Sequence, residues 1–290
     1  MERRTRARLI GAIAGALVLA SAVAATRAAT AQQRGTFALL GGTPKIASFA
    51  RSQPSGGPTV ALTIRQFRLD GKTAIVSYDV DMQKLIHLIV VRDDFGEFMH
   101  LHPTFDPATG TFRQSFAKDA GRSYVVYADT TPHGIGQQVF RFLIAADGWT
   151  NARQPSPRPY AAAASPPRVS AGPYSVVLAR TTLPANREQF VDLTVLKQGR
   201  PAPDLTPYLG AAAHAVFVEA STLAYVHVHP TLRGAPAAAM GAMEMNAGAQ
   251  AGPLMTMQVP PLPAGTYKLW IEFGGARGAV YVAPFTIRVA

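Results

Sequence analysis

The chain has 290 residues, of which 48% are hydrophobic and 16% charged, enough for about two domains with apolar cores. Its formal net charge is +11, but the basic residues are dispersed, so a nucleic-acid-binding surface is not expected. The absence of cysteine excludes disulfides, thiolate nucleophiles and blue-copper centres, which need a thiolate ligand.

Residues 1–31 have the pattern of a secretory signal peptide. A basic stretch, MERRTRAR, precedes an uncharged run rich in alanine and leucine, and Ala29 and Ala31 offer a cleavage site. The alternative is an uncleaved N-terminal anchor, although the run is short and rich in Ala and Gly for a membrane span. We therefore expect a periplasmic or secreted protein with no integral membrane span after cleavage.

Residues 32–57 are expected to form a flexible leader, because the segment closes with the turn-rich stretch RSQPSGGP. Short β-branched or aromatic stretches, each bounded by Asp, Gly or Pro, then predict the strands of a first domain at residues 58–148. The predicted strands are 59–69, 72–80, 84–91, 97–105, 110–117, 122–129 and 137–146.

A linker rich in proline and alanine is expected at residues 149–171, before a second domain at residues 172–290. About seven strands in roughly a hundred residues are typical of an immunoglobulin-like sandwich. The expected fold class is all-β, with two tandem immunoglobulin-like or cupredoxin-like β-sandwich domains. The strands predicted in the second domain are 173–180, 188–196, 211–220, 224–232, 254–260, 266–273 and 280–289.

Six of the seven histidines form two triplets with the same internal spacing, and a proline follows the last histidine of each. This repetition predicts that the two domains are related by duplication. The triplets are His87, His100 and His102 in the first domain and His214, His227 and His229 in the second.

Each triplet is expected on one face of a β-hairpin. Side chains alternate along a strand, so His100 and His102 share a face. A tight turn between the two strands places His87 opposite His102 and Ile89 opposite His100, and the same register is expected in the second domain. A shift of one residue would move the first histidine to the other face.

Three imidazoles on one face can bind zinc, copper or nickel and leave a position open for exchange. The alternative is an envelope interaction or adhesion module whose hairpin histidines are purely structural, as single strand histidines usually are. The repeated triplet favours metal binding. His133 lies in the turn TTPHGIG without a counterpart in the second domain and is expected to be a solvated loop residue.

A methionine-rich insertion distinguishes the second domain. Thioethers are soft ligands that select Cu(I), so Met240, Met243 and Met245 are candidate ligands beside the second triplet. Met255 and Met257 alternate in a predicted strand and can equally belong to the core. A mixed histidine and methionine site would favour copper over zinc.

The stretches PYLGAAAHAVFVEASTLAYVHVHP and LIHLIVVRDDFGEFMHLHP resemble the motif of uncharacterised bacterial secreted proteins, H-x12-H-x-H-P. The resemblance covers residues 58–148 and 172–290. It implies small β-sandwiches that handle heavy metals or copper, with the six motif histidines as site residues. The first copy has DMQKLIH where the second has a Y-L-G lead-in. The chain is also similar to periplasmic copper-handling proteins, but lacks a histidine at the expected mature N-terminus.

The sequence therefore predicts an exported, non-catalytic protein that binds a transition metal, copper or else zinc. Its expected role is metal sequestration or delivery in the cell envelope, with another envelope metal-handling protein as a partner. A metal-dependent hydrolase is not supported, because G-x-S-x-G, H-E-x-x-H and a suitably placed carboxylate base are absent from the sequence.

Overall fold

The computed structural model describes residues 32–150, 162–235, 245 and 250–290. The expected signal peptide lies outside the described residues. The described part of the chain is all-β, apart from one turn of 3-10 helix, η2 (Ala276–Gly278). Among these residues, no helix has both the length and the apolar character that a membrane span requires.

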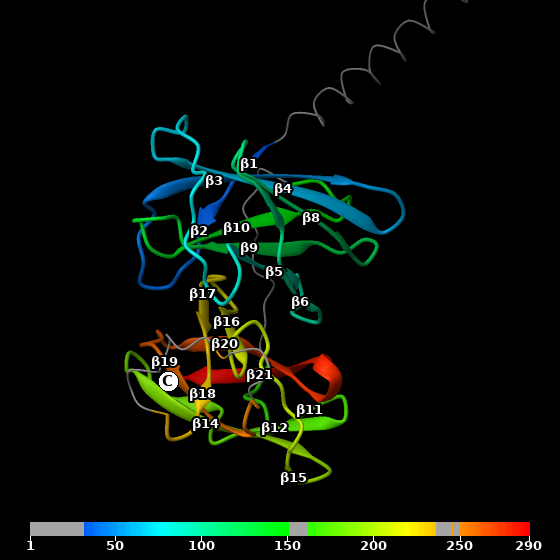
Figure 1. The fold of residues 1–290 in the computed structure, drawn as a ribbon, viewed down its shortest axis with the longest axis vertical. Helices are drawn as coiled ribbons and strands as arrows, with labels where there is room; N and C mark the ends of the chain where they lie inside the picture. Colours follow the sequence, from blue (N-terminus) through cyan, green and yellow to red (C-terminus); the bar gives the residue numbers. More distant parts are fainter. Residues whose placement is uncertain (1–31, 151–161, 236–244, 246–249) are drawn as a thin grey trace, which may run out of the picture.

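The first sandwich consists of two sheets (Figure 1). One sheet has the strand order β1-β3-β4-β8-β7 and the other β2-β10-β9-β5-β6. Apolar side chains from both sheets, such as Leu62 and Val126, fill the space between them. The strands are β1 (Gln33–Arg34), β2 (Thr36–Phe37), β3 (Ile46–Pro54), β4 (Thr59–Arg68), β5 (Ile86–Arg92), β6 (Phe98–Leu101), β7 (Thr104–Asp106), β8 (Thr111–Ala117), β9 (Tyr124–Thr130) and β10 (Gln138–Ile144).

Residues 33–54, which we expected in a flexible leader, instead form β1, β2 and β3 of this sandwich. β3 pairs with β4 along its whole length, from Ile46 opposite Arg68 to Pro54 opposite Val60. Its buried residues include small ones, among them Ala47 and Ser48, so that the sequence carries only a weak apolar alternation. The leader is therefore part of the first core.

Residues 72–80, which we expected to be a strand, form none. Ile75 is the one buried side chain of this segment, whereas Val76 and Val80 are 49% and 66% exposed. The backbone touches the sheets through isolated bridges, such as that between Phe67 and Ala74. Tyr78 adds a half-buried ring at the edge of the core, and this is too little apolar burial to stabilise a full sheet position.

The second sandwich has the sheets β11-β12-β14-β19-β18, with β15 paired to β14, and β13-β21-β20-β16-β17. This order matches that of the first sandwich except at the short edge strand β13, which follows β12 in the chain and pairs parallel with β21, whereas β2 precedes β3 and pairs antiparallel with β10. Residues 168–171, which we expected in the linker, form its first strand. The matching order favours duplication, which stays a prediction. The strands are β11 (Arg168–Ala171), β12 (Tyr174–Leu178), β13 (Thr182–Leu183), β14 (Gln189–Lys197), β15 (Arg200–Pro201), β16 (His214–Glu219), β17 (Tyr225–Val228), β18 (Thr231–Leu232), β19 (Leu254–Val259), β20 (Gly265–Gly274) and β21 (Val280–Val289).

The two sandwiches form two lobes that meet where the hairpins β5–β6 and β16–β17 approach each other (Figure 1). Side chains that point away from each sandwich's own core form a third apolar cluster, which includes Ile89, Tyr127, Val216 and Trp270. Tyr225 in β17 also exchanges backbone hydrogen bonds of 2.8 and 3.0 Å with the segment before β3. One sheet of each sandwich is therefore buried on both faces.

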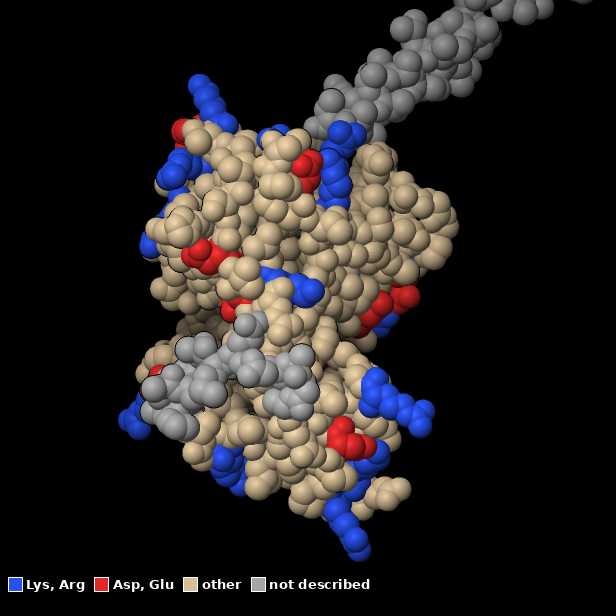
Figure 2. Space-filling model, in the orientation of Figure 1, with Lys and Arg blue, Asp and Glu red and all other residues tan. Residues whose placement is uncertain are grey.

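Charged side chains are scattered over both lobes on the face shown in Figure 2, without a dense basic patch on that face. The junction between the lobes is mainly apolar, and its buried polar groups include the histidines and two carboxylates described next.

Candidate metal centre

Both hairpins have the register expected from the sequence. Ile89 lies opposite His100 in β5–β6, and Val216 lies opposite His227 in β16–β17. The strands β6 and β17 end just before the H-P pair of each motif, and the chain crosses to the other sheet of the sandwich at β7 and β18. Because proline cannot donate a ladder hydrogen bond, it fixes the last histidine of each motif at the end of a strand.

Each triplet converges into a triad, in which one ring nitrogen from each histidine lies within 4.8 Å of the others. His87 Nδ1 is 2.8 Å from His100 Nε2, and His214 Nδ1 is 3.2 Å from His227 Nε2. With metal–nitrogen bonds of about 2.0 Å, these separations correspond to nitrogen–metal–nitrogen angles of roughly 90° and 105°. Both values suit a three-imidazole site with an open position.

A carbonyl oxygen in a tight turn holds the first histidine of each triad. The Nε2–H group of His87 donates to Asp81 O, and that of His214 donates to Tyr208 O, both at 3.0 Å. These bonds leave the Nδ1 lone pair of each neutral ring free for an ion. Both turns have two central residues with positive φ, namely Met82 and Gln83 in the first and Leu209 and Gly210 in the second. DMQK and YLGA therefore form equivalent turns.

The central histidine of each triad contacts a carboxylate of the other domain. His100 Nδ1 is hydrogen-bonded to Glu272 Oε2 at 2.6 Å, and His227 Nδ1 lies 3.5 Å from Asp129 Oδ2. Each carboxylate lies directly opposite the first histidine of its own domain. The two contacts therefore cross the junction in opposite directions and link each triad to the neighbouring domain.

Hydrogen bonds from its own surroundings hold the carboxylate of Asp129 in place. Gln137 donates to both oxygens at 2.9 and 3.0 Å, and the Tyr225 hydroxyl donates to Oδ2 at 3.1 Å. Among the described residues, the Glu272 carboxylate is hydrogen-bonded to His100 alone. Glu272 therefore depends more than Asp129 on its histidine for hydrogen bonding.

The two triads also face each other. The ring centroids of His87 and His227 are 5.4 Å apart, and those of His100 and His214 are 5.3 Å apart. Within the triads the corresponding separations run from 4.6 to 5.3 Å. From the sequence we expected one site in each domain, and this arrangement was missed. The uninterrupted apolar runs of the strands that carry His87 and His214 were a signal, because such runs indicate burial on both faces.

Burial keeps the six imidazoles neutral. It lowers the pKa of His102 to about 3, and it places the pKa of His100, His214 and His227 well below the ordinary value. Neighbouring imidazoles add to this effect in all four. Neutral imidazoles are the form that binds metal ions.

Burial has the opposite effect on the two carboxylates. It raises the pKa of Glu272 to about 8 and that of Asp129 to about 7. A protonated Glu272 allows a continuous chain of hydrogen bonds without an ion, from its carboxyl group through His100 and His87 to Asp81 O. This chain is the physical basis for a purely structural role of the histidines.

The third histidine of each triad has no place in such a chain. The Nε2 atoms of His102 and His229 are buried and have no hydrogen-bond partner among the described residues. A buried polar atom without a partner carries a free-energy penalty, which an ion shared by three rings would remove. The donor set and its geometry therefore fit a transition-metal ion in each triad.

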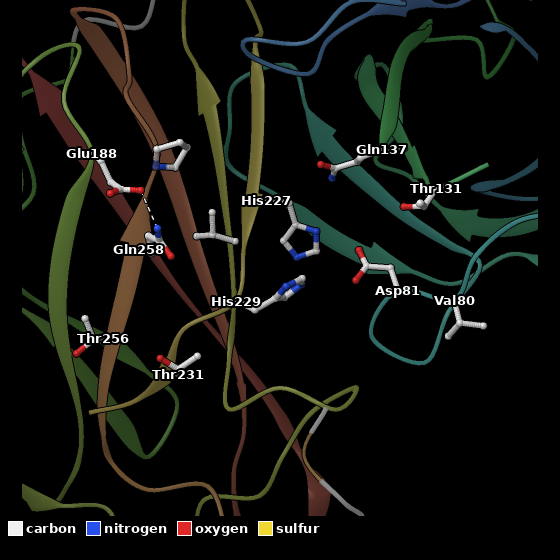
Figure 3. A pocket seen from close by; sticks show the side chains of 12 residues that line it. Val80, Asp81, Thr131, Gln137, Glu188, His227, His229, Thr231, Thr256 and Gln258 are labelled. Atoms are coloured by element: carbon white, nitrogen blue, oxygen red, sulfur yellow. Dashed lines mark hydrogen bonds between the residues drawn. The ribbon is translucent and has the colours of Figure 1, made fainter. Parts of the chain in front are cut away.

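A cavity of about 520 Å³ reaches the second triad from between the domains (Figure 3). The first domain contributes Asp81, Thr131 and Gln137 to its lining, and the second contributes His227 and His229. The carboxylate of Asp81 faces the two imidazoles in Figure 3. A negative charge at this position attracts cations towards the ring nitrogens.

The other predicted ligands have different positions. Met240 and Met243 lie outside the described residues. Met245 packs against the core of the second sandwich, and its N–H group donates to Gly210 O at 2.6 Å, in the turn that holds His214. Its role as a ligand stays a prediction. Met255 and Met257 are core residues. His133 is exposed, as expected, and its Nδ1 is 2.6 Å from Asp79 Oδ1.

Fold and site together define an all-β protein of two sandwiches whose histidine triads meet at the domain junction. Residues 168–290, the second sandwich, match the model of a family described as a domain of unknown function (DUF8832). No curated protein matches the chain. The family description assigns no metal or activity, so the function has to be argued from the site.

Proposed function

We propose that this protein binds copper ions at its two histidine triads and serves their sequestration or delivery in the cell envelope. The observation that carries this proposal is the pair of buried Nε2 atoms of His102 and His229 without hydrogen-bond partners. Each belongs to a cluster of three neutral imidazoles with the spacing of metal ligands. A structural hydrogen-bond network leaves these two atoms unexplained.

Charge balance favours a monovalent over a divalent ion. The six imidazoles are neutral, and the buried groups that contact them carry at most two negative charges, on Glu272 and Asp129. Two Cu(I) ions would make the centre neutral, whereas two Zn²⁺ ions would leave two positive charges buried without partners. Uncompensated buried charge is strongly unfavourable. Zinc binding, the alternative, would need further anionic ligands, which Asp81 in the cavity could supply in part.

The methionine-rich segment supports copper as well, since thioethers select Cu(I). The hydrogen bond from Met245 N–H to Gly210 O brings Met245 itself beside the turn that holds His214. The proposed export rests on the signal-peptide pattern of residues 1–31. We propose a non-catalytic role, in which a second envelope metal-handling protein exchanges ions with the site.

The test is a metal titration of the purified chain without its first 31 residues. We expect two Cu(I) ions per chain in competition with a Cu(I) chelator, and weaker binding of Zn²⁺. In the double variant His102→Ala/His229→Ala the Cu(I) affinity of both triads should fall by two or more orders of magnitude, because each triad loses one of its three ligands. His133→Ala, at an exposed histidine outside the triads, is the matched control. Binding that is absent in the wild type, or equal in the double variant, would refute the proposal.

A further inference from the structure

The contacts of Glu272 and Asp129 across the junction indicate more than two separate sites. We propose that each domain controls the metal affinity of the other through its buried carboxylate, so that the two triads form one dinuclear centre. Glu272 of the second domain acts on the triad of the first, and Asp129 of the first domain acts on the triad of the second. The inference rests on the proposed metal binding at both triads.

The physical basis is the hydrogen bond that a ligating imidazole makes with its second nitrogen. A carboxylate in this position fixes the ring orientation and the tautomer, and it makes the ligating nitrogen more basic. His100 receives this support from Glu272 and has its Nε2 atom directed at His87. His227 Nε2 is likewise directed at His214, whereas its Nδ1 lies 3.5 Å from Asp129 Oδ2 without a hydrogen bond, so its support is electrostatic.

The burial of the two carboxylates strengthens the argument. Asp129 is 2% and Glu272 5% exposed, and both lie in strands that are otherwise apolar at the junction. A charge in such a place costs free energy unless a cation or a hydrogen-bond donor compensates it. Cations bound by the imidazoles next to both groups would provide that compensation.

The two ions would lie close together. An ion about 2 Å from a ring nitrogen is about 3 Å from the ring centroid, so the 5.3 Å separation of the His100 and His214 rings limits the ion–ion distance to roughly 12 Å. Two paramagnetic ions within this limit, such as Cu(II), would interact through their magnetic dipoles.

The two contacts differ in strength. The distance from Glu272 to His100 is that of a charge-assisted hydrogen bond, at 2.6 Å. Asp129 lies 3.5 Å from His227 and shares its oxygens with Gln137 and Tyr225. Loss of the Glu272 charge should therefore lower the metal affinity of its triad more than loss of the Asp129 charge lowers that of the other triad.

The experiment isolates one site at a time in the full chain. The variant His214→Ala/His229→Ala retains the first triad, and His87→Ala/His102→Ala retains the second. In the first background we expect Glu272→Gln to weaken Cu(I) binding 10- to 100-fold and Asp129→Asn to change it less than threefold. In the second background the order should reverse, so that Asp129→Asn weakens Cu(I) binding more than Glu272→Gln does. This weakening should be smaller than that caused by Glu272→Gln in the first background. Circular dichroism and thermal unfolding report whether each variant is folded.

The proposal that each carboxylate acts on the triad of the other domain would be overturned if both substitutions had equal effects in one background. It would also be overturned if Glu272→Gln had no effect on Cu(I) binding at the first triad. A wild-type chain that binds no copper would instead refute the proposed function itself. A second measurement needs no carboxylate variant. The wild type loaded with two Cu(II) ions should give an electron paramagnetic resonance spectrum with dipolar broadening that both single-site backgrounds lack. An unbroadened spectrum at two ions per chain would overturn the dinuclear centre.

Discussion

Replacement of His102 by alanine should separate metal binding from folding. Its Nε2 atom has no hydrogen-bond partner among the described residues, so the substitution breaks no bond of that atom. The metal-free variant should therefore lose only about 1 kcal/mol of stability, from reduced contacts of the ring. The contrasting variant is His87→Ala, which removes contacts of 2.8 and 3.0 Å and leaves buried partners unpaired. It should cost about 2–4 kcal/mol even without metal.

The His102→Ala variant should lose more stability in the presence of the metal than in its absence. At a free ion concentration of 100 times Kd, one site adds about 2.7 kcal/mol to the free energy of unfolding. If the loss of one ligand weakens binding 100-fold, the same ion concentration adds only about 0.4 kcal/mol. His102→Ala should therefore lose about 2.3 kcal/mol of metal-dependent stabilisation, which is more than its cost in the metal-free state.

The assay is urea unfolding followed by circular dichroism, with chelator or with buffered Cu(I), on wild type, His102→Ala, His87→Ala and the exposed control His133→Ala. The control should match the wild type in both conditions. The reasoning fails if His102→Ala costs more than about 2 kcal/mol with chelator present and retains the full increment from copper. That result would assign His102 to a structural network.

Three further predictions concern the surroundings of the centre. Tyr225→Phe removes a 3.1 Å hydrogen bond to the buried carboxylate of Asp129 and should cost about 1.5–3 kcal/mol in urea unfolding. Tyr127→Phe, in the ring stacked on Tyr225, loses only a 3.3 Å bond to a carbonyl and should cost less than about 1 kcal/mol. Both variants are compared at a pH above the value of about 7 to which burial raises the pKa of Asp129, and equal losses there would contradict a charge-assisted hydrogen bond from Tyr225 to Asp129. The metal-free protein should lose stability as the pH falls from 6.5 towards 3, because the lowered pKa values of the six triad histidines make the unfolded chain bind more protons in this window. The raised pKa values of Glu272 and Asp129 act in the opposite sense, but two carboxyl groups offset only part of the effect of six imidazoles, so unfolding curves of equal midpoint at pH 7 and pH 4 would speak against it. Gly210→Ala places a side chain at φ +74° and should cost roughly 1–2 kcal/mol, and in copper titrations it should weaken the second site more than Gly121→Ala, a remote glycine at φ +70°.

The sequence allowed the local geometry of each triad to be predicted. The alternation of side chains and the short turn predicted the register that pairs Ile89 with His100, and the prolines predicted where the histidine strands end. These inferences depend on contacts between residues close in sequence, for which strand periodicity is sufficient. The errors at residues 33–54 and 72–80 arose where that periodicity is weak or misleading. Small residues such as Ala47 obscured a real strand, and Val76 and Val80 imitated one on the surface.

The junction was harder to predict, because an apolar face indicates burial without indicating the partner. Ile89 and Val91 belong to a face that could have packed against any apolar surface. The carboxylates offered a clearer signal, since each is an acidic residue within an apolar strand. When the two domains are aligned on their Ala-Gly pairs at residues 120–121 and 264–265, Asp129 falls opposite Phe273 instead of Glu272. A difference of one residue in the preceding turn therefore concealed the equivalence.

That equivalence bears on why two such sandwiches occur in one chain. A single sandwich would contain a complete triad but no carboxylate for its central histidine, because Glu272 and Asp129 each contact the other domain. It would also expose the outward face of its second sheet, which includes Ile89 and Val91 in the first domain. Exposed apolar surface of this kind promotes association. Pairing two copies buries both faces and supplies both carboxylates in one arrangement, so the tandem is the smallest unit in which both sites are complete.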